Sequence, residues 1–345
     1  MPVSLVHQSD PEFGTPVQVA EGIWWIRLPI ALSVNHVNVY LLEDDAGWVL
    51  VDTGLDSEPS RSVLTDAISV TPFAEKPIIK VIVTHYHPDH VGMAGNFTNA
   101  GATENPAELL TSRTCWQTSN LLHADNPPTP CVERVRFMQN AGINGIELES
   151  FKRRPPSSYA KMVCSLPRSY TRLIDQQTLK IGNRSWRIII GNGHADEHVT
   201  LWSDDNIAIV GDQILPAISP NLSVHFSEPN ADVVSEWLES CVNFGSIADD
   251  ETLCLPGHNR PYTGVPTRCF QFLDNCEQII SRIEQSLKKP KTAADLMTDI
   301  YRREISSNEK FSLIGETMGY LNHLLNTNRV KRRVSSTGAF RWQLN

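Results

Sequence analysis

The sequence lacks the cysteine pairs that build disulfide frameworks and thiolate zinc sites. Its seven cysteines form an odd set with no CxxC pair, so we expect reduced thiols. No window approaches the roughly 18 apolar residues that span a bilayer. The first sixteen residues contain no basic stretch followed by an apolar one, which a signal peptide would require. These absences predict a cytoplasmic protein without membrane contact.

The composition is ordinary, but the charge is unevenly distributed. Hydrophobic residues make up 41% and charged residues 20% of the 345 positions, as in globular proteins that bury a real core. From Asn259 onward there are 14 basic and 8 acidic residues, whereas the first 258 residues hold 16 and 31. A basic tail on an acidic body is either a nucleic-acid footprint or a solvated helical surface, and we favour the second.

Short runs rich in Val, Ile and aromatic residues alternate with turn residues along most of the chain. They predict strands at 22–30, 36–42, 47–52, 77–84, 178–182, 185–190, 198–203, 206–210 and 252–256. Helical patterns are clearest at 54–69 and 230–244. Strands in both halves with helices between them predict an α+β fold, a layered sandwich of sheets covered by helices.

Two regions depart from this alternation. Residues 101–170 are rich in helix breakers, with one probable helix at 131–142, and we expect an insertion that either faces substrate or is structural padding. After Tyr262, three helices (269–287, 291–301 and 313–328) and a two-stranded wing around "SSTG" look like a small winged-helix unit. The predicted domains are therefore 18–262 and 263–345.

The stretch "THYHPDH" places four metal-ligand side chains directly after a buried strand. Residues two apart in an extended chain point the same way, so His85 and His87 converge on one point. Pro88 then turns the chain and presents Asp89 and His90 toward a second point nearby. Because Zn²⁺ accepts imidazole and carboxylate ligands, the spacing suits two adjacent ions.

Three further ligand-type residues follow apolar strands and stand beside glycines: His194, Asp212 and His258. Glycine permits a close approach of the backbone. A competing motif, "HADEH" (194–198), matches the inverted zinc-peptidase signature, which requires a helix. Here it lies between two predicted strands, so we expect His198 to support or pack against the ligands and Glu197 to be a turn or surface carboxylate.

"THYHPDH" followed by "GH", "GD" and "PGH" resembles the metallo-β-lactamase superfamily over most of residues 20–260. The resemblance implies a four-layer αβ/βα sandwich with a dinuclear site at one edge. It implies that His85, His87 and His194 hold one ion, that Asp89, His90 and His258 hold the other, and that Asp212 bridges them. Asp52, in "LVDTG", would support this ligand shell.

Two neighbouring cations lower the pKa of a bridging water enough to supply hydroxide at neutral pH. We therefore expect a hydrolase in which this hydroxide attacks an ester, thioester or lactone carbonyl of a small molecule, with Asp89 steering the nucleophile or a proton. Zn²⁺ is the expected ion, and Fe²⁺ and Mn²⁺ are alternatives that histidine and carboxylate ligands also accept.

The C-terminal region leaves alternatives open. It resembles the winged-helix extension of one superfamily branch, which includes a β-lactamase-like endoribonuclease, and the chain also has glyoxalase II-like relatives. An endoribonuclease would bind RNA through the wing residues Lys331, Arg332 and Arg333, or the wing could join two copies in a homodimer. A noncatalytic metal-binding scaffold is the third hypothesis, and the complete ligand set argues against it.

Overall fold

The computed structural model describes every residue except 1, 32, 33, 100, 126, 157 and 306. Its contacts divide the chain into two compact units. Unit 1 comprises residues 1–126, 158–220 and 244–268, and unit 2 comprises 127–157, 221–243 and 269–345. The division passes within helices α7 (Val233–Ile247) and α8 (Val265–Ser286).

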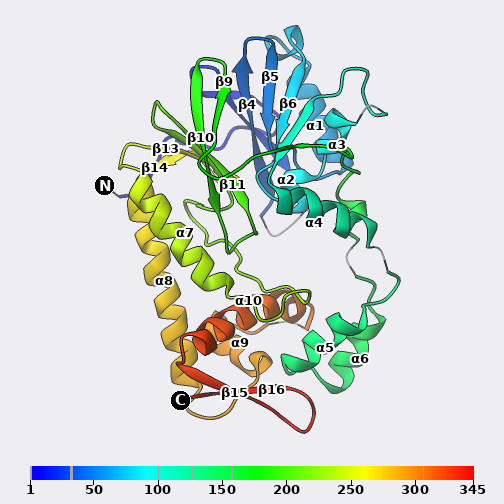
Figure 1. Cartoon of the computed structure of the whole chain (residues 1–345), viewed down its shortest axis with the longest axis vertical. Coiled ribbons are helices and arrows are strands. Elements are labelled where there is room, and N and C mark those ends of the chain that lie inside the picture. Colours follow the sequence, from blue (N-terminus) through cyan, green and yellow to red (C-terminus); the bar gives the residue numbers. More distant parts are fainter. Residues whose placement is uncertain (1, 32–33, 100, 126, 157, 306) are drawn as a thin grey trace. The chain divides into compact units, whose positions relative to one another are not determined.

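Unit 1 is built on two seven-stranded sheets (Figure 1). The first sheet has the order β2-β3-β4-β5-β6-β7-β8. Its strands are β2 (Val17–Ala20), β3 (Ile23–Pro29), β4 (His36–Asp44), β5 (Gly47–Val51), β6 (Ile78–Ile82), β7 (Glu108–Thr111) and β8 (Thr171–Arg172). Strands β5 to β8 run parallel to one another, so their carboxyl ends share one edge of the sheet.

The second sheet has the order β1-β14-β13-β12-β11-β10-β9. Its strands are β1 (Ser4–Leu5), β9 (Thr178–Ile181), β10 (Arg184–Gly191), β11 (His198–Ser203), β12 (Ile207–Gly211), β13 (Leu253–Pro256) and β14 (Tyr262–Thr263). Strands β12 and β13 are parallel. This sheet therefore also brings two strand ends, and the residues that follow them, to one edge.

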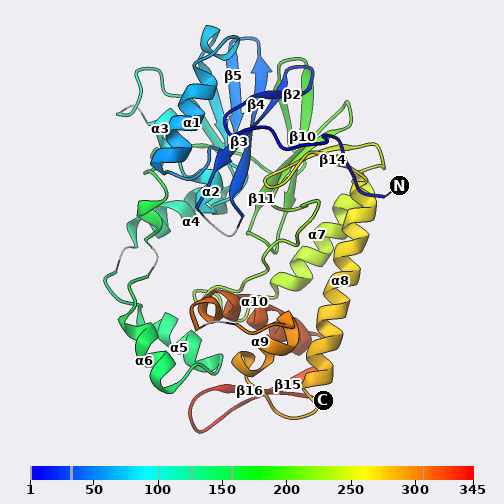
Figure 2. The ribbon, with the colours of Figure 1, turned by 180° about the vertical axis from the view of Figure 1, so that it is seen from behind.

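The two sheets enclose an apolar core that includes Trp25, Tyr40, Val51, Trp186 and Leu201. Alternate residues of β4 point to opposite faces, so Leu41 packs instead in a second core on the outer face of the first sheet. Helices α1 (Glu58–Ile68), α3 (Ala94–Thr98) and α4 (Arg113–Ala124) contribute to this outer core. Figure 2 shows α1 and α3 beside β3 to β5.

Unit 2 is mainly helical. It contains α5 (Val132–Asn140), α6 (Gly145–Arg153), α9 (Ala293–Tyr301), α10 (Ser307–Asn326) and most of α8, together with the antiparallel hairpin β15 (Val330–Val334) and β16 (Phe340–Leu344). Helix α9 begins with a capping box, in which Thr292 and Asp295 each accept the other's backbone N–H. The apolar side chains of Leu296, Met297 and Ile300 in this helix are buried.

The predicted α+β sandwich is confirmed, and each predicted strand and helix has a counterpart. The helix predicted at 131–142 is present as α5, and residues 101–170 also contain strand β7 and helices α4 and α6, which the sequence analysis did not predict. The three C-terminal helices and the terminal hairpin are present. All seven cysteines are free thiols, and none of the described helices is long and apolar enough to cross a membrane.

Candidate metal centre

The histidines and aspartates singled out in the sequence all follow strand ends at one edge of unit 1. His85 lies just after β6, and the short helix α2 (Pro88–Val91) carries Asp89 and His90. His87 is extended, with φ −66° and ψ 143°, and the helix begins at Pro88, as proline at the first helical position favours. The proline therefore separates the directions of His87 and His90.

The second sheet contributes the remaining candidates. His194 lies in the connection between β10 and β11, Asp212 follows β12, and His258 follows β13. Ligand-type atoms gather within 4.8 Å of one another in three overlapping groups: His85, His87 and His194; His85, His90 and Asp212; and Asp89, His90 and His258. The structure thus brings together all seven residues predicted as ligands.

Asp212 lies between the groups. Its Oδ1 is 3.3 Å from Nε2 of His90, and its Oδ2 is 3.1 Å from Nε2 of His258 and 3.7 Å from Nε2 of His194. Asp89 Oδ2 approaches Nε2 of His258 at 3.4 Å. Nitrogen atoms of the group that contains His194 and of the group that contains His90 and His258 thus lie around the Asp212 carboxylate. This is the position that a bridging ligand needs.

Asp52 supports the cluster from the end of β5. Its carboxylate accepts hydrogen bonds from the backbone N–H and the hydroxyl of Thr84, each at 2.8 Å, and lies 2.7 Å from Nδ1 of His90. The Thr84 hydroxyl is also 3.0 Å from Nδ1 of His85. Asp52 has a φ of 57°, an unusual conformation for a residue other than glycine, and such strain persists where the surroundings fix it.

The electrostatics differ across the cluster. Burial lowers the pKa of His85 well below its usual value and that of His87 to about 4. These imidazoles are therefore neutral at pH 7, the form that binds metal. Burial also opposes protonation of His90 and His258, but nearby carboxylates, Asp212 foremost, raise the pKa of His90 far above normal and that of His258 to about 10.

The residues present fit a pair of cations. The Nε2 atom of His85 is buried without a hydrogen-bond partner among the described residues, a costly arrangement unless another group satisfies it. Asp89 and Asp212 have lowered pKa values, because the neighbouring histidines outweigh the opposing effect of burial. Buried carboxylates beside imidazole nitrogens form a donor set suited to divalent ions.

The glycines beside the ligands allow the close approach that the sequence predicted. A Cβ added to Gly257 would lie 2.2 Å from Asp212 Oδ1 and 2.7 Å from His90 Cε1. A Cβ at Gly211, where φ is +49°, would lie 2.7 Å from the His198 ring. Both positions therefore exclude a side chain.

"HADEH" is not a helix but a turn between β10 and β11, so the peptidase signature does not apply. The His198 ring stacks on His85, with centroids 4.5 Å apart, and its Nε2 accepts the backbone N–H of Asp212 at 3.3 Å. The Glu197 carboxylate accepts the N–H and hydroxyl of Thr114 in the first turn of α4 and pairs with Arg172. Neither residue can act as a helical zinc ligand.

Sequence reasoning missed several contacts. The backbone carbonyl of His36 lies 2.7 Å from Nδ1 of His258, and the Asn38 side chain donates to the loop that carries His258. Two positions after His258, Arg260 pairs with Asp10 in the N-terminal segment. The one sequence signal for the contacts of His36 and Asn38 is that these two polar residues alternate with apolar residues along a single predicted strand.

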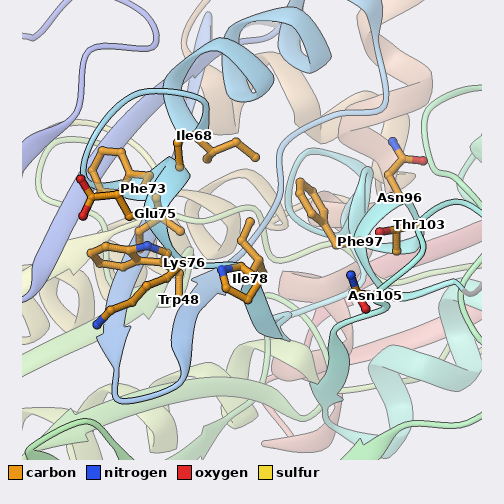
Figure 3. Close-up of a pocket in the computed structure, with 13 residues that line it drawn as sticks. Trp48, Ile68, Phe73, Glu75, Lys76, Ile78, Asn96, Phe97, Thr103 and Asn105 are labelled. Carbon is orange, nitrogen blue, oxygen red and sulfur yellow. The ribbon is translucent and has the colours of Figure 1, made fainter.

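A cavity of about 460 Å³ lies away from the predicted metal ligands. Figure 3 shows its walls, which include Trp48, Phe73, Ile78 and Phe97, with Lys76 at the rim. Trp48 is near the start of β5 and Ile78 is the first residue of β6. The cavity is therefore at the opposite end of these strands from Asp52 and His85.

Comparisons with known proteins agree with this geometry. Residues 32–258 match the family described as "Metallo-beta-lactamase superfamily", and residues 280–345 match "Metallo-beta-lactamase-like, C-terminal domain". The "Probable metallo-hydrolase YqjP" of Bacillus subtilis (strain 168) is 24% identical over 318 residues, which cover 88% of this chain and 92% of that protein.

Two further relatives differ in their extent. The crystal structure of a beta-lactamase domain protein from Burkholderia ambifaria has a TM-score of 0.88 and 29% identity, and the match covers 99% of this chain and 97% of the other. The human "Acyl-coenzyme A thioesterase MBLAC2" is 32% identical over 98 residues, or 27% of this chain and 35% of that protein. The family match spans more than half of the chain and contains the whole histidine and aspartate cluster, so this protein belongs to the metallo-beta-lactamase superfamily and is a hydrolase of that superfamily.

Proposed function

We propose that the protein hydrolyses an ester, thioester or lactone of a small molecule with two divalent ions, Zn²⁺ by preference. One ion would be held by His85, His87 and His194, and the other by Asp89, His90 and His258, with Asp212 shared. The observation that carries this proposal is the position of the Asp212 carboxylate, whose two oxygens face nitrogen atoms of both groups.

Bound ions would polarise the carbonyl under attack and make water nucleophilic at neutral pH. The chain's own residues set the geometry. The neutral imidazoles of His85 and His87 offer lone pairs to an ion. Asp52 fixes the Nδ1 atom of His90, and the His36 carbonyl fixes the Nδ1 atom of His258. Asp89 lies within reach of the His258 ring, where its carboxylate can hold a proton or orient a water molecule.

A small carbonyl substrate is supported by two observations. One relative with local similarity is named an acyl-coenzyme A thioesterase. The first 258 residues, which contain all seven predicted ligands, carry 31 acidic against 16 basic residues. An acidic body of this kind repels a polyanion such as RNA.

Several cations in and beside the wing are engaged in contacts within the protein. The Arg332 guanidinium lies 4.4 Å from the Phe340 ring centroid and 5.4 Å from that of Trp342, and burial lowers its pKa. Arg329 is paired with Glu277 and Glu284, and Arg341 is paired with Asp295. These pairings favour a structural use of the basic tail, and we rank the endoribonuclease second.

Assays on an activated thioester, a lactone and single-stranded RNA separate these functions. We expect the purified protein to cleave one of the two small carbonyl substrates, to lose this activity with a chelator, and to regain it when Zn²⁺ is added back. His87→Ala should lower the rate by more than ~100-fold, because changes next to metal ligands alone cost about 10- to 100-fold.

The double variant Lys331→Ala/Arg333→Ala is the matched control at the wing. It should hydrolyse the small substrate at the rate of the unaltered protein. Cleavage of RNA that falls in this variant would establish the endoribonuclease instead. An activity that survives both chelation and His87→Ala would end the metal-hydrolase proposal.

A further inference from the structure

One strand of the first sheet holds the loop of the second sheet that carries His258. His36, Asn38 and Tyr40 alternate along β4, so their side chains share the face that points to the second sheet. The Asn38 amide donates to the carbonyls of Pro256 and Asn259 at 2.8 and 2.6 Å, and the Tyr40 hydroxyl donates to Pro256 at 2.8 Å. The backbone N–H of Asn38 also donates to Gly257 at 2.7 Å.

The orientation of the Asn38 amide is fixed at both ends. Its Oδ1 accepts the indole N–H of Trp25 at 2.8 Å, and an indole can only donate. Its Nδ2 faces two carbonyl oxygens, which can only accept. Asn38 is 1% exposed, so water does not substitute for these partners. No other residue type of this size satisfies donor and acceptors together.

The loop needs such support because it is bent into an unfavourable conformation. Asn259 has a φ of 67°, in the left-handed region, which asparagine adopts more readily than most residues but less readily than glycine. Its N–H donates to Nε2 of His36 at 2.8 Å, and its carbonyl accepts from Asn38. Both ends of the strained residue are therefore bonded to side chains of β4.

A shift of this loop would reach the cluster directly. Gly257 approaches Asp212 and His90 so closely that no Cβ fits, and the next residue is His258. His85, His87 and His194 come from other connections and make none of these bonds. The loop therefore acts directly on the group that contains His258, and it reaches the other group only through the shared Asp212.

We propose that Asn38 is a positioning residue for the second ion, the one assigned to Asp89, His90 and His258. It holds the loop 256–259 in the bent form that aims His258 at that ion, and it acts on the ion at His85, His87 and His194 only through the shared Asp212. The inference rests on the two-ion site proposed above. Its readout is the affinity of each ion, which does not depend on an assay of activity.

The test is a titration of the metal-free full-length protein with Zn²⁺ in competition with a chromophoric chelator, with metal content measured independently. Asn38→Asp has almost the same shape but sets an oxygen against the Pro256 and Asn259 carbonyls. We expect two ions for the unaltered protein, and in Asn38→Asp a second ion bound about 10- to 100-fold more weakly, with a clearly smaller loss for the first ion.

Thr200→Val is the matched control. Thr200 is also fully buried, accepts an indole N–H, from Trp202, and donates to a backbone carbonyl, that of Ile189. It makes no bond to the loop 256–259, so both ion affinities should stay within about twofold of normal. An equal loss in Thr200→Val and Asn38→Asp would reduce Asn38 to a general core residue and overturn the proposal.

A further variant separates positioning from folding. Glycine adopts a positive φ without strain, so Asn38→Ala/Asn259→Gly should bind the second ion more tightly than Asn38→Ala. No gain from the glycine would contradict the role of the strained turn. Two ions bound normally by folded Asn38→Asp would overturn the positioning role alone, whereas one ion or none in the unaltered protein would overturn the two-ion site with it.

Discussion

The two units treat their buried titratable groups in opposite ways. In unit 2, the Tyr301 hydroxyl donates to the Glu316 carboxylate, and His323 lies against Asp232 and Ser235. In unit 1, the Nε2 atom of His85 is buried without such a partner among the described residues, and the Nε2 atoms of His90 and His258 both face the Asp212 carboxylate. These groups of unit 2 are joined in small separate contacts, whereas unit 1 gathers several imidazole nitrogens around shared carboxylates.

This difference separates a structural arrangement from a binding one. A folded chain seldom buries several imidazoles and carboxylates in one place without a reason, and such a cluster is suited to bound cations. Paired groups in unit 2 instead fix helices against one another. The comparison can be broken by showing that unit 1 is stable without ions, or that changes in unit 2 alter ion binding.

The largest effect is expected from removing the ions. Ions at 1,000 times their dissociation constant stabilise the folded state by about 4 kcal/mol per site. A chelator should therefore increase hydrogen exchange in peptides around residues 82–91 and 207–214, and leave peptides of α9 and α10 unchanged. Mass spectrometry of exchanged peptides measures both at once. Equal loss of protection in α9 and α10 would remove the contrast between the units.

Asp52→Asn should have the next largest effect. An asparagine amide has only one acceptor oxygen, whereas the aspartate accepts with both of its oxygens. The contact with either Thr84 or His90 is therefore lost. We expect ion affinity to fall about 10- to 100-fold, measured by competition with a chromophoric chelator. Asp295→Asn is the control in unit 2, since Asp295 accepts the Thr292 N–H in a capping box. That variant should cost helix stability and leave ion affinity unchanged.

The parts of the molecule that could be predicted from sequence depend on local patterns. Alternation of apolar residues identifies β4 and β5, and the short spacing from His85 to His90 identifies most of the cluster. Contacts between distant segments leave no such mark. Asn38 and Pro256 are 218 positions apart, and nothing in either short segment names the other. Helix α4, "RTCWQTSNLLHA", was missed although Ser112 before it is an N-cap residue whose side chain accepts the backbone N–H of Cys115.

The smallest effect concerns pH and belongs to unit 2. Burial raises the pKa of Glu316 and outweighs the Tyr301 hydroxyl, which lowers it. A raised pKa in the folded state contributes stability at pH values below the unfolded pKa, and this contribution is lost as pH rises through the folded value. Glu316→Gln carries no titrating proton, so it should remove this part of the pH dependence, at most about 1.4 kcal/mol per pH unit.

Urea unfolding between pH 4 and pH 8, followed by circular dichroism, measures the difference between the two proteins and cancels the titration of unit 1. Tyr301→Phe sharpens the result, because it deletes the hydroxyl that lowers the pKa of Glu316. The loss of stability should then extend to a higher pH. Ion affinity should be the same in all three proteins, since Glu316 and Tyr301 belong to unit 2 and their contact is with each other. A change in ion affinity with Glu316→Gln would show that the two units are energetically coupled, and the contrast between them would no longer hold.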